Sequence, residues 1–385
     1  MRVAIVHHWF VSQGGGERVA EVLAEMYPSA DLFTLVADPK KVPPSLRNRR
    51  LQTSLINRLP FSSRIYRNLL PLYPTAVERL DLRGYDLVLS SDSGPMKGVT
   101  VSPSAVHICY CHSPMRYLWD QYHHYRRSMG PIARATFGLS AEYVREWDQR
   151  ASRRVTQFIA NSRYVASRIR EYYGRESVVI HPPVETSAGH IAGKPGEAYL
   201  TVGRLVPYKR IDLLIQACNI LGRELRIIGT GPEESSLRAL AGKTIKFLGN
   251  VDEASLWHEY ANCRAFLFGG EEDFGMAMVE AQSCGRPVIA FGKGGALEAV
   301  VSPKRTAYSP QDTCVLFDRQ SPEAVIKALL CFEAAEYRFD PLIIRRHAER
   351  FGVQAFRRSF RAVVDDTIAN FSPAKRLEAP CEQSA

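Results

Sequence analysis

Two acidic residues, Glu272 and Glu280, stand eight positions apart in a segment bounded by glycines, GGEEDFGMAMVEAQSCGRPVIAFGKGG, which covers residues 269–295. Its pattern predicts a strand, a loop that holds Glu272, and a short helix at 276–284 that holds Glu280. The free amides at the start of this helix, from about Phe274 to Ala277, can accept a phosphate. Carboxylates on both sides of these amides can bind hydroxyl groups, so the segment suits a ligand with phosphate and hydroxyls, such as a nucleotide sugar. The two acids could also be the acid and nucleophile of a glycosidase, but the phosphate-binding features beside them argue against it.

Two cations follow the strand-like run YLTV. In GRLVPYK, Arg204 and Lys209 flank the turn that begins at Gly203 and leads into a helix-like run. Arginine offers phosphate oxygens a planar fork and lysine offers a flexible point charge, so the pair could stabilise negative charge that grows on a leaving diphosphate. The alternative is two solvated cations without a ligand.

Glycine-rich turns follow two other strand-like runs. Three glycines at 14–16 separate the first strand from a helix that begins near Glu17, and the amides of such a turn can attract an anion or leave room for a ligand. The alternative is a tight chain reversal. The run IIGTGPEE contains G-x-G ending at Gly231, but Glu234 replaces the third glycine of a dinucleotide fingerprint, which disfavours a hydride-transferring enzyme.

Strand-like apolar runs alternate with helix-like segments along the whole chain, a pattern that predicts parallel sheets covered by helices. A looser piece that contains glycine and proline, ETSAGHIAGKPGEA, separates two such series. We therefore expect two Rossmann-like domains, residues 1–184 and 199–351, joined by a linker at 185–198. Ligands bind such sheets at the carboxyl ends of the strands, which is where the motifs above lie.

The composition is typical of a cytosolic globular protein. Of the 385 residues 45% are apolar and 23% are charged, and no stretch suits a signal peptide or a membrane-spanning helix. Eight cysteines are scattered without metal-binding or redox spacing, so we expect them to be reduced. No metal-ligand cluster stands out, so neither a metal nor another cofactor is expected. Disorder is expected only in the tail at 373–385.

The formal net charge of +10 favours an anionic partner. Between Ser45 and Pro74 the chain has no acidic residue, and apolar side chains alternate with six arginines: Arg47, Arg49, Arg50, Arg58, Arg64 and Arg67. A basic amphipathic segment of this kind can rest on an anionic membrane, each arginine adding about 1 kcal/mol. The alternatives are a solvated arginine-rich face over a packed helix and a nucleic-acid site, for which no familiar binding module is present.

Together, these motifs resemble those of retaining glycosyltransferase family 4. The stretch EDFGMAMVE matches the EX7E motif of that family and continues into GRPVIAFGKGG, while GRLVPYK, GTGPEE and FLGNV occur in the expected order. The first domain adds GGGER, which contains Glu17, and HSPMRYLWD, which contains Asp120. The second of these is most similar to bacterial mannosyltransferases of O-antigen and other surface polysaccharide synthesis. The resemblance covers most of the second domain and reaches the first through these two segments.

The resemblance implies a GT-B fold, in which two Rossmann-like domains face a central cleft and the C-terminal helix, here about 352–372, crosses back to the first domain. It implies that Glu272 binds donor-sugar hydroxyls, Glu280 binds the nucleotide ribose, and Arg204 and Lys209 hold the diphosphate. The catalytic residues expected from it are His112, Glu272, Arg204 and Lys209. The donor-binding residues expected from it are Gly15, Gly16, Gly203, Arg204, Lys209, Gly231, Glu272, Phe274, Gly275, Met276, Ala277 and Glu280. His112 matches a position that faces the donor sugar, and a core or turn-forming histidine is the alternative.

The activity implied by the resemblance is transfer of a hexose with retention, the acceptor hydroxyl attacking the face that the nucleoside diphosphate leaves. Mannose from GDP-mannose is the expected donor and a lipid-linked saccharide the expected acceptor, at the inner face of the cell membrane, where the six arginines would touch it. The alternatives are a UDP-sugar donor (glucose or N-acetylglucosamine) and a non-catalytic subunit that binds a sugar nucleotide. Nucleic acid is not expected as a partner. Lys97 and Arg116 could be further cations of the cleft or structural hydrogen-bond donors.

Overall fold

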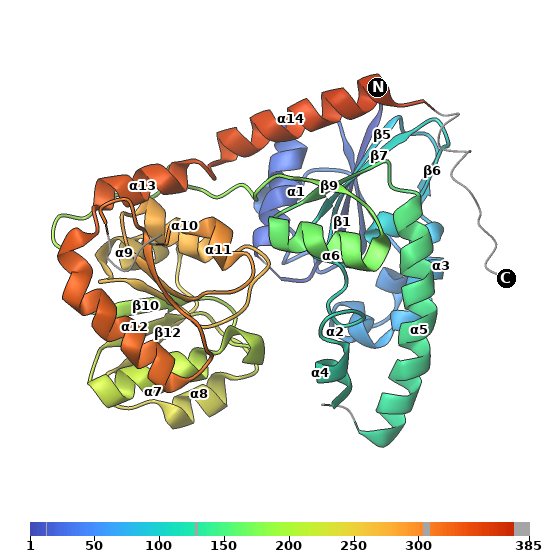
Figure 1. Cartoon of the computed structure of the whole chain (residues 1–385). Coiled ribbons are helices and arrows are strands. Elements are labelled where there is room, and N and C mark those ends of the chain that lie inside the picture. Colours follow the sequence, from blue (N-terminus) through green and yellow to red (C-terminus); the bar gives the residue numbers. More distant parts are fainter. Residues whose placement is uncertain (13, 128–129, 303–308, 373–385) are drawn as a thin grey trace. The chain divides into compact units, whose positions relative to one another are not determined.

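The computed structural model describes residues 1–12, 14–127, 130–302 and 309–372. The chain forms two compact units: unit 1 contains Met1–His181 and the segment from Arg357 onwards, and unit 2 contains Pro182–Phe356. Each unit is built on a parallel sheet with helices packed on it (Figure 1). The predicted α/β class with two Rossmann-like units is therefore confirmed.

Seven parallel strands form the sheet of unit 1, in the order β3-β2-β1-β5-β7-β8-β9. Their bounds are β1 Val3–Phe10, β2 Asp31–Ala37, β3 Leu51–Thr53, β5 Leu87–Asp92, β7 Val106–Cys111, β8 Gln157–Ala160 and β9 Ser177–Val179, and a separate pair consists of β4 Asp81–Leu82 and β6 Thr100–Val101. The central strands β5 and β7 are buried at every position, as expected of parallel strands covered on both faces. The strand order reverses between β1 and β5, and ligands bind open α/β sheets at the carboxyl ends of strands beside such a reversal.

The helices of unit 1 are α1 Gly15–Met26, α2 Ser62–Ile65, α3 Tyr73–Glu78, α4 Tyr122–Arg127, α5 Pro131–Arg153, α6 Arg163–Tyr173 and most of α14 Val353–Asn370. Five 3-10 turns complete it: η1 Pro44–Leu46, η2 Leu55–Arg58, η3 Tyr66–Asn68, η4 Leu70–Leu72 and η5 Met96–Gly98. Helix α14 packs on this unit through Phe360, which is buried and lies 6.5 Å from the ring centre of Tyr110.

Six parallel strands form the sheet of unit 2, in the order β12-β11-β10-β13-β14-β15, with a reversal between β10 and β13. Their bounds are β10 Tyr199–Val202, β11 Leu225–Ile228, β12 Ile245–Gly249, β13 Phe266–Phe268, β14 Val288–Phe291 and β15 Cys314–Phe317. The helices are α7 Ile211–Leu221, α8 Glu234–Leu240, α9 Glu253–Asn262, α10 Met276–Ser283, α11 Ala296–Ala299, α12 Pro322–Ala335 and α13 Pro341–Glu349, with 3-10 turns η6 Pro207–Lys209 and η7 Glu336–Arg338.

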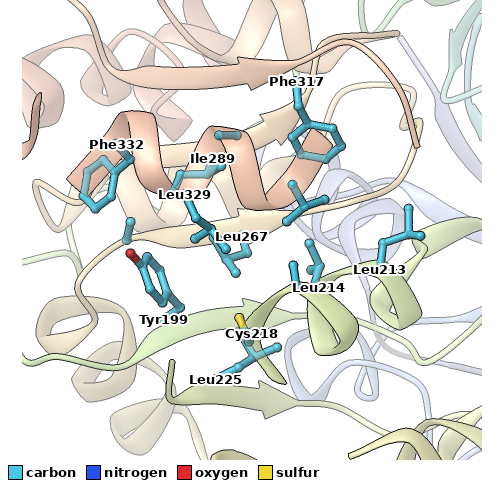
Figure 2. Packing of buried hydrophobic residues seen from close by; sticks show 14 of the residues in the cluster. Tyr199, Leu213, Leu214, Cys218, Leu225, Leu267, Ile289, Phe317, Leu329 and Phe332 are labelled. Atoms are coloured by element: carbon cyan, nitrogen blue, oxygen red, sulfur yellow. The ribbon is translucent and has the colours of Figure 1, made fainter. Parts of the chain in front are cut away.

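A dry core fixes the strands of unit 2 beneath helices α7 and α12. The two helices contribute apolar side chains that pack with those of all six strands, and Figure 2 shows part of this cluster. Labelled members of this cluster are Tyr199, Leu213, Leu214, Cys218, Leu225, Leu267, Ile289, Phe317, Leu329 and Phe332. Because the strands are fixed in this way, the loops at their carboxyl ends start from rigid positions.

The boundaries of the units differ from the predicted ones. The division lies at 181/182, and the segment 185–198 belongs to unit 2 instead of forming a separate linker. Its lack of periodicity predicts no helix or strand, but its backbone groups still find partners: Gly189 accepts a hydrogen bond from Arg345, and Gly196 donates one to Asn262. The helix predicted at 352–372 is α14, and the chain passes from unit 2 to unit 1 within it. The tail at 373–385 lies outside the described residues.

The arginine-rich segment is not one amphipathic helix. It is divided among the end of η1, β3, η2, α2, η3, η4 and the start of α3. Arg49 donates to the carbonyl oxygens of Ala24 and Pro28 at 2.8 and 2.6 Å, at the end of α1, and Arg47 donates to Val42. Arg47 and Arg49 therefore have backbone partners within unit 1.

The seven cysteines that the structure describes are free thiols, six of them buried, and Cys381 lies in the undescribed tail. Across the described segments, no helix has both the length and the apolar character needed to cross a membrane.

Candidate functional site

The predicted site residues of unit 2 gather beside its reversal of strand order. Lys209 ends the turn η6 that follows β10, and Glu272 lies in the loop that follows β13. Lys209 Nζ lies 2.6 Å from Glu272 Oε1, and the side chains are only 17% and 20% exposed. Burial disfavours the charged lysine, but the carboxylate of Glu272 outweighs it, and the pKa of Lys209 is raised overall. Lys209 is therefore charged at neutral pH.

Glycines allow the loops around this pair to pack backbone against backbone. A Cβ atom at Gly231 would lie 2.2 Å from the carbonyl oxygen of Leu205, and one at Gly270 would lie 2.7 Å from that of Tyr208. A side chain at either position would displace the turn that carries the two predicted cations. The structure thus shows a packing role for Gly231, for which we predicted a donor contact.

Helix α10 begins with unbonded amides. Its N-cap, Gly275, has a φ of +92°, a conformation that glycine adopts without a steric cost. No side chain among the described residues caps this end, and Met276 and Ala277 are half-buried. The first amides of the helix therefore have no side-chain cap, and their binding of a phosphate stays a prediction. The backbone of Glu272 is held beside them, because its carbonyl accepts from the Gly295 amide at 2.8 Å.

Glu280 is held by a residue that the sequence analysis missed. The hydroxyl of Tyr260, on α9, donates to Glu280 Oε2 at 2.7 Å, and Tyr260 is completely buried. Burial raises the pKa of Glu280, and the hydrogen bond from Tyr260 opposes this rise. A tyrosine on the buried face of a helix is ordinary core in sequence, so nothing in the pattern distinguishes this one.

Arg204 differs from Lys209 in its surroundings. Both lie in the same turn, but Arg204 is exposed and has no ion pair within the part of the chain that the structure describes. The structure therefore places the lysine, and not the arginine, in contact with Glu272.

In unit 1, a histidine cluster surrounds Ser91 at the carboxyl ends of β1, β5 and β7. The Ser91 hydroxyl lies 2.8 Å from His112 Nε2 and 3.1 Å from His7 Nδ1, and the Ser91 carbonyl lies 3.2 Å from His8 Nδ1. The dipeptide His7-His8 before the glycine run is a signal that could have indicated this cluster from the sequence. Ser91, within an apolar strand, gives no such signal.

Burial keeps the cluster uncharged. It lowers the pKa of His7 and His8, and together with the neighbouring His8 it lowers the pKa of His112 to about 3. All three rings are neutral at physiological pH, and each therefore carries one N–H.

The same three histidines are the one group of metal-ligand type that the described residues bring together. His7, His8 and His112 each place a nitrogen within 4.8 Å of the others. Three imidazoles can bind zinc. Here Ser91 accounts for one nitrogen of every ring, so hydrogen bonds explain the cluster without an ion. Our prediction that no metal is required stays a prediction.

The glycine run brings α1 against this cluster. A Cβ atom at Gly16 would lie 3.2 Å from a ring carbon of His8 and 3.7 Å from His112 Nε2, so glycine permits this approach. Helix α1 begins at Gly15, two residues before the predicted start. The carboxyl group of Glu17 turns back to the Gly14 amide in the manner of a capping box, and burial raises its pKa to about 7.

The two weaker candidates of unit 1 have structural partners. Lys97 is 2% exposed, forms an ion pair with Asp148 and lies 3.8 Å from Asp92. Arg116 donates to Asp120 at 3.2 Å, and Asp120 also pairs with Arg168. For Lys97 the structure supports the role of a structural donor.

Two protein-family models match most of this chain. Residues 13–188 match the family described as Glycosyltransferase Family 4, and residues 185–341 match the family described as Glycosyl transferases group 1. The chain belongs to the family 4 glycosyltransferases. The two matches meet near the division between units, so each unit of this family 4 chain corresponds to one of them.

Curated relatives of this family 4 chain include a mannosyltransferase and an inositol phosphate glycosyltransferase. A GDP-mannose-dependent monoacylated alpha-(1-6)-phosphatidylinositol monomannoside mannosyltransferase of Corynebacterium glutamicum is 40% identical over 113 residues, which is 25% of this chain and 30% of the relative. A D-inositol 3-phosphate glycosyltransferase of Geodermatophilus obscurus is 29% identical over 266 residues, 60% of this chain and 55% of the relative. The chain thus spans about a third to a half of the length of the curated relatives it matches.

Solved structures share the GT-B fold with this chain. HepE of Anabaena in complex with UDP superposes with a TM-score of 0.68 at 15% identity, over 95% of this chain and 100% of that chain. Sucrose-phosphate synthase of Thermosynechococcus elongatus superposes with a TM-score of 0.69 at 16% identity, over 96% and 100%. At this identity the likeness establishes the fold and leaves the donor open.

Proposed function

We propose that this chain transfers a hexose from a nucleoside-diphosphate sugar to an acceptor hydroxyl, with retention of configuration. The observation that carries the proposal is the arrangement at α10. An uncapped helix N-terminus lies between Glu272, paired with Lys209 at 2.6 Å, and Glu280, held by Tyr260. Amides and a cation suit the diphosphate, and two fixed carboxylates suit the hydroxyls of the sugar and the ribose.

In the proposed reaction the bond between the anomeric carbon and the diphosphate oxygen breaks while the acceptor oxygen bonds to the same face of that carbon. The electron pair of the broken bond goes to the diphosphate, which also takes the proton of the acceptor hydroxyl. Negative charge therefore grows on the diphosphate in the transition state. Lys209, Arg204 and the amides of Met276 and Ala277 would stabilise this charge, and a divalent cation would then be unnecessary.

We assign to His112 a contact with a donor-sugar hydroxyl. A neutral imidazole can direct one hydrogen bond without placing a second cation near the reacting carbon, where positive charge develops. The lowered pKa of His112, about 3, agrees with this role.

We propose mannose from GDP-mannose as the donor. Two relatives with the words GDP-mannose-dependent in their names, from Corynebacterium glutamicum and Mycolicibacterium smegmatis, are 40% and 30% identical to parts of this chain. The second candidate is a UDP-sugar such as UDP-glucose, because HepE, whose fold this chain shares, is solved with UDP and with UDP-glucose.

As acceptor we propose a lipid-linked saccharide of bacterial surface polysaccharide synthesis, such as the O-antigen, at the inner face of the cell membrane. Support comes from the same two relatives, whose names describe acceptors that are mannosides of phosphatidylinositol and thus carry lipid. The enzyme would then be peripheral to the membrane.

Thermal unfolding of the whole chain with GDP, UDP, ADP, GDP-mannose, UDP-glucose and UDP-N-acetylglucosamine tests the donor. A ligand at 100 times its dissociation constant stabilises the folded state by about 2.7 kcal/mol. We expect GDP and GDP-mannose to raise the midpoint, with and without EDTA. If only the uridine compounds raise the midpoint, the donor is a UDP-sugar and the GDP-mannose proposal is wrong. If the midpoint rises only with a divalent cation, the proposal that no metal is needed is wrong.

Release of GDP from GDP-mannose tests catalysis. We expect slow hydrolysis by the wild-type chain and an increase when membrane extracts that contain lipid-linked saccharides are added. Donor binding without any turnover under both conditions would favour the non-catalytic subunit instead.

A further inference from the structure

Two segments of unit 1, far apart in the sequence, contain no acidic residue. Residues 39–77 hold eight lysines and arginines, and residues 121–141 hold Arg126, Arg127 and Arg134. Uninterrupted positive charge over this length attracts anions more strongly than the average net charge of the chain indicates.

The fold brings these two segments together. Helices α2 and α4 lie at the same end of unit 1 (Figure 1), and Arg67, just after α2, is close enough to Tyr125 of α4 to interact with it electrostatically. The cluster beneath them contains Tyr66 and Tyr73 from the first segment and Tyr122 from the second. One continuous core thus supports both segments.

Apolar side chains project from this basic surface. Leu59 is 40% exposed, Phe61 is 73% exposed, and Leu72 is 48% exposed. Phe61 also has a φ of +56°, in the left-handed region that bulky residues avoid. Such a conformation costs about 1–3 kcal/mol. The carbonyl of Phe61 accepts hydrogen bonds from the amides of Arg64 and Ile65, so this conformation begins α2 and leaves the aromatic ring exposed to solvent.

Arginines flank Phe61 on both sides. Arg58 ends η2 and Arg64 lies in α2; both are exposed, and neither has an ion pair or side-chain hydrogen bond in the described part of the chain. Arg67 is also exposed and donates to the hydroxyl of Tyr66. These three arginines, unlike Arg49, are therefore available to anions outside the protein.

We infer that this surface, which we call the Phe61 face (Arg58, Leu59, Phe61, Arg64, Arg67 and Tyr125), binds an anionic lipid membrane. Phe61 and Leu59 enter the headgroup region, and the arginines contact lipid phosphates. An apolar tip between cations matches the layered chemistry of a membrane surface, whereas a nucleic acid backbone offers nothing for Leu59 to contact. The inference deepens the proposed lipid-linked acceptor, although the contact itself needs neither donor nor acceptor.

Flotation with lipid vesicles tests the inference on the full chain. We expect binding to vesicles of phosphatidylglycerol mixed with phosphatidylcholine, weakening as salt is raised, and no binding to phosphatidylcholine alone. Arg58→Gln with Arg64→Gln should weaken binding about thirtyfold, from about 1 kcal/mol per arginine. Phe61→Ser should weaken it roughly tenfold, because the buried apolar ring is lost.

A charge-matched control comes from α14, in the same unit. Arg358→Gln with Arg361→Gln removes the same charge from exposed positions outside the Phe61 face, and should leave vesicle binding within about twofold of wild type. If both double variants lose vesicle binding equally, the net charge of the protein explains the loss and the assignment of the Phe61 face is wrong. Absence of wild-type binding, or binding of a labelled DNA duplex that the Arg58 and Arg64 substitutions abolish, would overturn it as well.

Donor binding separates this inference from the proposed function. The Phe61→Ser variant should retain the wild-type rise in melting temperature with GDP. If GDP has no effect on any variant while vesicle binding follows the expected pattern, the membrane contact stands and the donor assignment fails.

Discussion

Lys209 Nζ and Glu272 Oε1 are 2.6 Å apart, so the cation assigned to the diphosphate is paired with the carboxylate assigned to the sugar. Without a ligand, each group satisfies the charge of the other in a half-buried setting. A diphosphate that binds here must compete with Glu272 for the lysine, and a sugar hydroxyl that donates to Glu272 weakens that competition. The pair can thus couple the binding of the two parts of one donor.

Glu272→Gln should separate nucleotide affinity from turnover. With the carboxylate removed, Lys209 can offer its full charge to a diphosphate, so the dissociation constant of GDP should stay the same or fall. Turnover of GDP-mannose should fall about a hundredfold, because a hydrogen bond to a charged group is worth about 1.5–3 kcal/mol. Calorimetry with GDP and a GDP-release assay measure the two effects.

Lys209→Gln should do the reverse, weakening GDP binding about tenfold or more. The control is Lys246→Gln, since Lys246 also forms an ion pair, with Glu224 at 3.0 Å, at the surface of the same unit. GDP affinity equal to wild type in Lys209→Gln, or full turnover in Glu272→Gln, would contradict the site assignment.

Tyr260→Phe tests whether Glu280 binds the ribose. The substitution removes the 2.7 Å hydrogen bond that orients the carboxylate, and without it the pKa of the buried Glu280 rises further, which makes a poorer acceptor. GDP affinity should fall about fivefold, the equivalent of one hydrogen bond of about 1 kcal/mol. A GDP analogue without the 2′ and 3′ hydroxyls should bind wild type and variant equally.

The matched control for this test is Tyr199→Phe. Tyr199 is likewise buried in unit 2 and donates to a glutamate, Glu333, at 2.9 Å, but on the face packed by α12. If both variants lose affinity for the analogue and for GDP alike, Tyr260 acts only through the stability of the unit.

The fold and the loop positions of unit 2 could be predicted from the sequence, because both depend on local patterns. Apolar runs bounded by glycine predicted β13 and α10. The order of apolar, acidic and glycine residues around Glu272 and Glu280 predicted that the two acids lie on either side of the start of a helix. What the patterns could not give is pairing between distant segments. That Lys209 reaches Glu272 depends on the strand order, in which β10 and β13 are neighbours although six elements separate them in the chain.

Partners buried in the core were missed for a related physical reason. Tyr260 and Ser91 occur within apolar helix and strand patterns, where their types are compatible with ordinary packing. Their roles become visible only from the side chains that they contact, Glu280 for Tyr260 and His112 for Ser91. In the arginine-rich segment, composition alone predicted one membrane-facing surface. Arg49 instead donates hydrogen bonds to carbonyl oxygens at the end of α1, contacts that no sequence pattern reveals.

Glu17 should make the stability of unit 1 depend on pH. Burial raises its pKa from 4.5 to about 7, so the folded chain keeps this proton at pH values where the unfolded chain has released it. The folded state binds more protons between these values, and stability is therefore lost as the pH rises from about 5 to 8. Glu17→Gln cannot lose a proton, and should gain about 3 kcal/mol relative to wild type across this range.

Chemical unfolding at about pH 5 and pH 8 measures the free energy of unfolding of Glu17→Gln and of the wild-type chain. Glu21→Gln, which removes a partly exposed carboxyl group one turn further along α1, is the control and should follow wild type. Parallel pH profiles for Glu17→Gln and wild type would show that Glu17 is ionised in the folded chain.

The Ser91 hydroxyl should determine which nitrogen of His112 carries hydrogen. A serine hydroxyl has one hydrogen, so it donates to either His7 Nδ1 or His112 Nε2 and accepts from the other. His7 Nε2 is buried without a partner among the described residues, and a hydrogen there would be a buried donor with no acceptor. His7 therefore donates to Ser91, Ser91 donates to His112 Nε2, and the hydrogen of His112 is on Nδ1.

Ser91→Ala should release this constraint and Ser90→Ala should not, because Ser90, the neighbour in β5, bonds His107 at 2.9 Å instead. We expect ¹⁵N NMR to show His112 with hydrogen on Nδ1 in wild type and in Ser90→Ala, and a shift towards Nε2 in Ser91→Ala. GDP-mannose turnover in Ser91→Ala should fall about fivefold, the equivalent of one lost hydrogen bond of about 1 kcal/mol. Since the pKa of His112 is about 3, wild-type turnover should show no His112 titration between about pH 5 and 8. Hydrogen on Nε2 in the wild-type protein would reverse the direction of the relay, and His112 would then accept a hydrogen bond from the sugar instead of donating one.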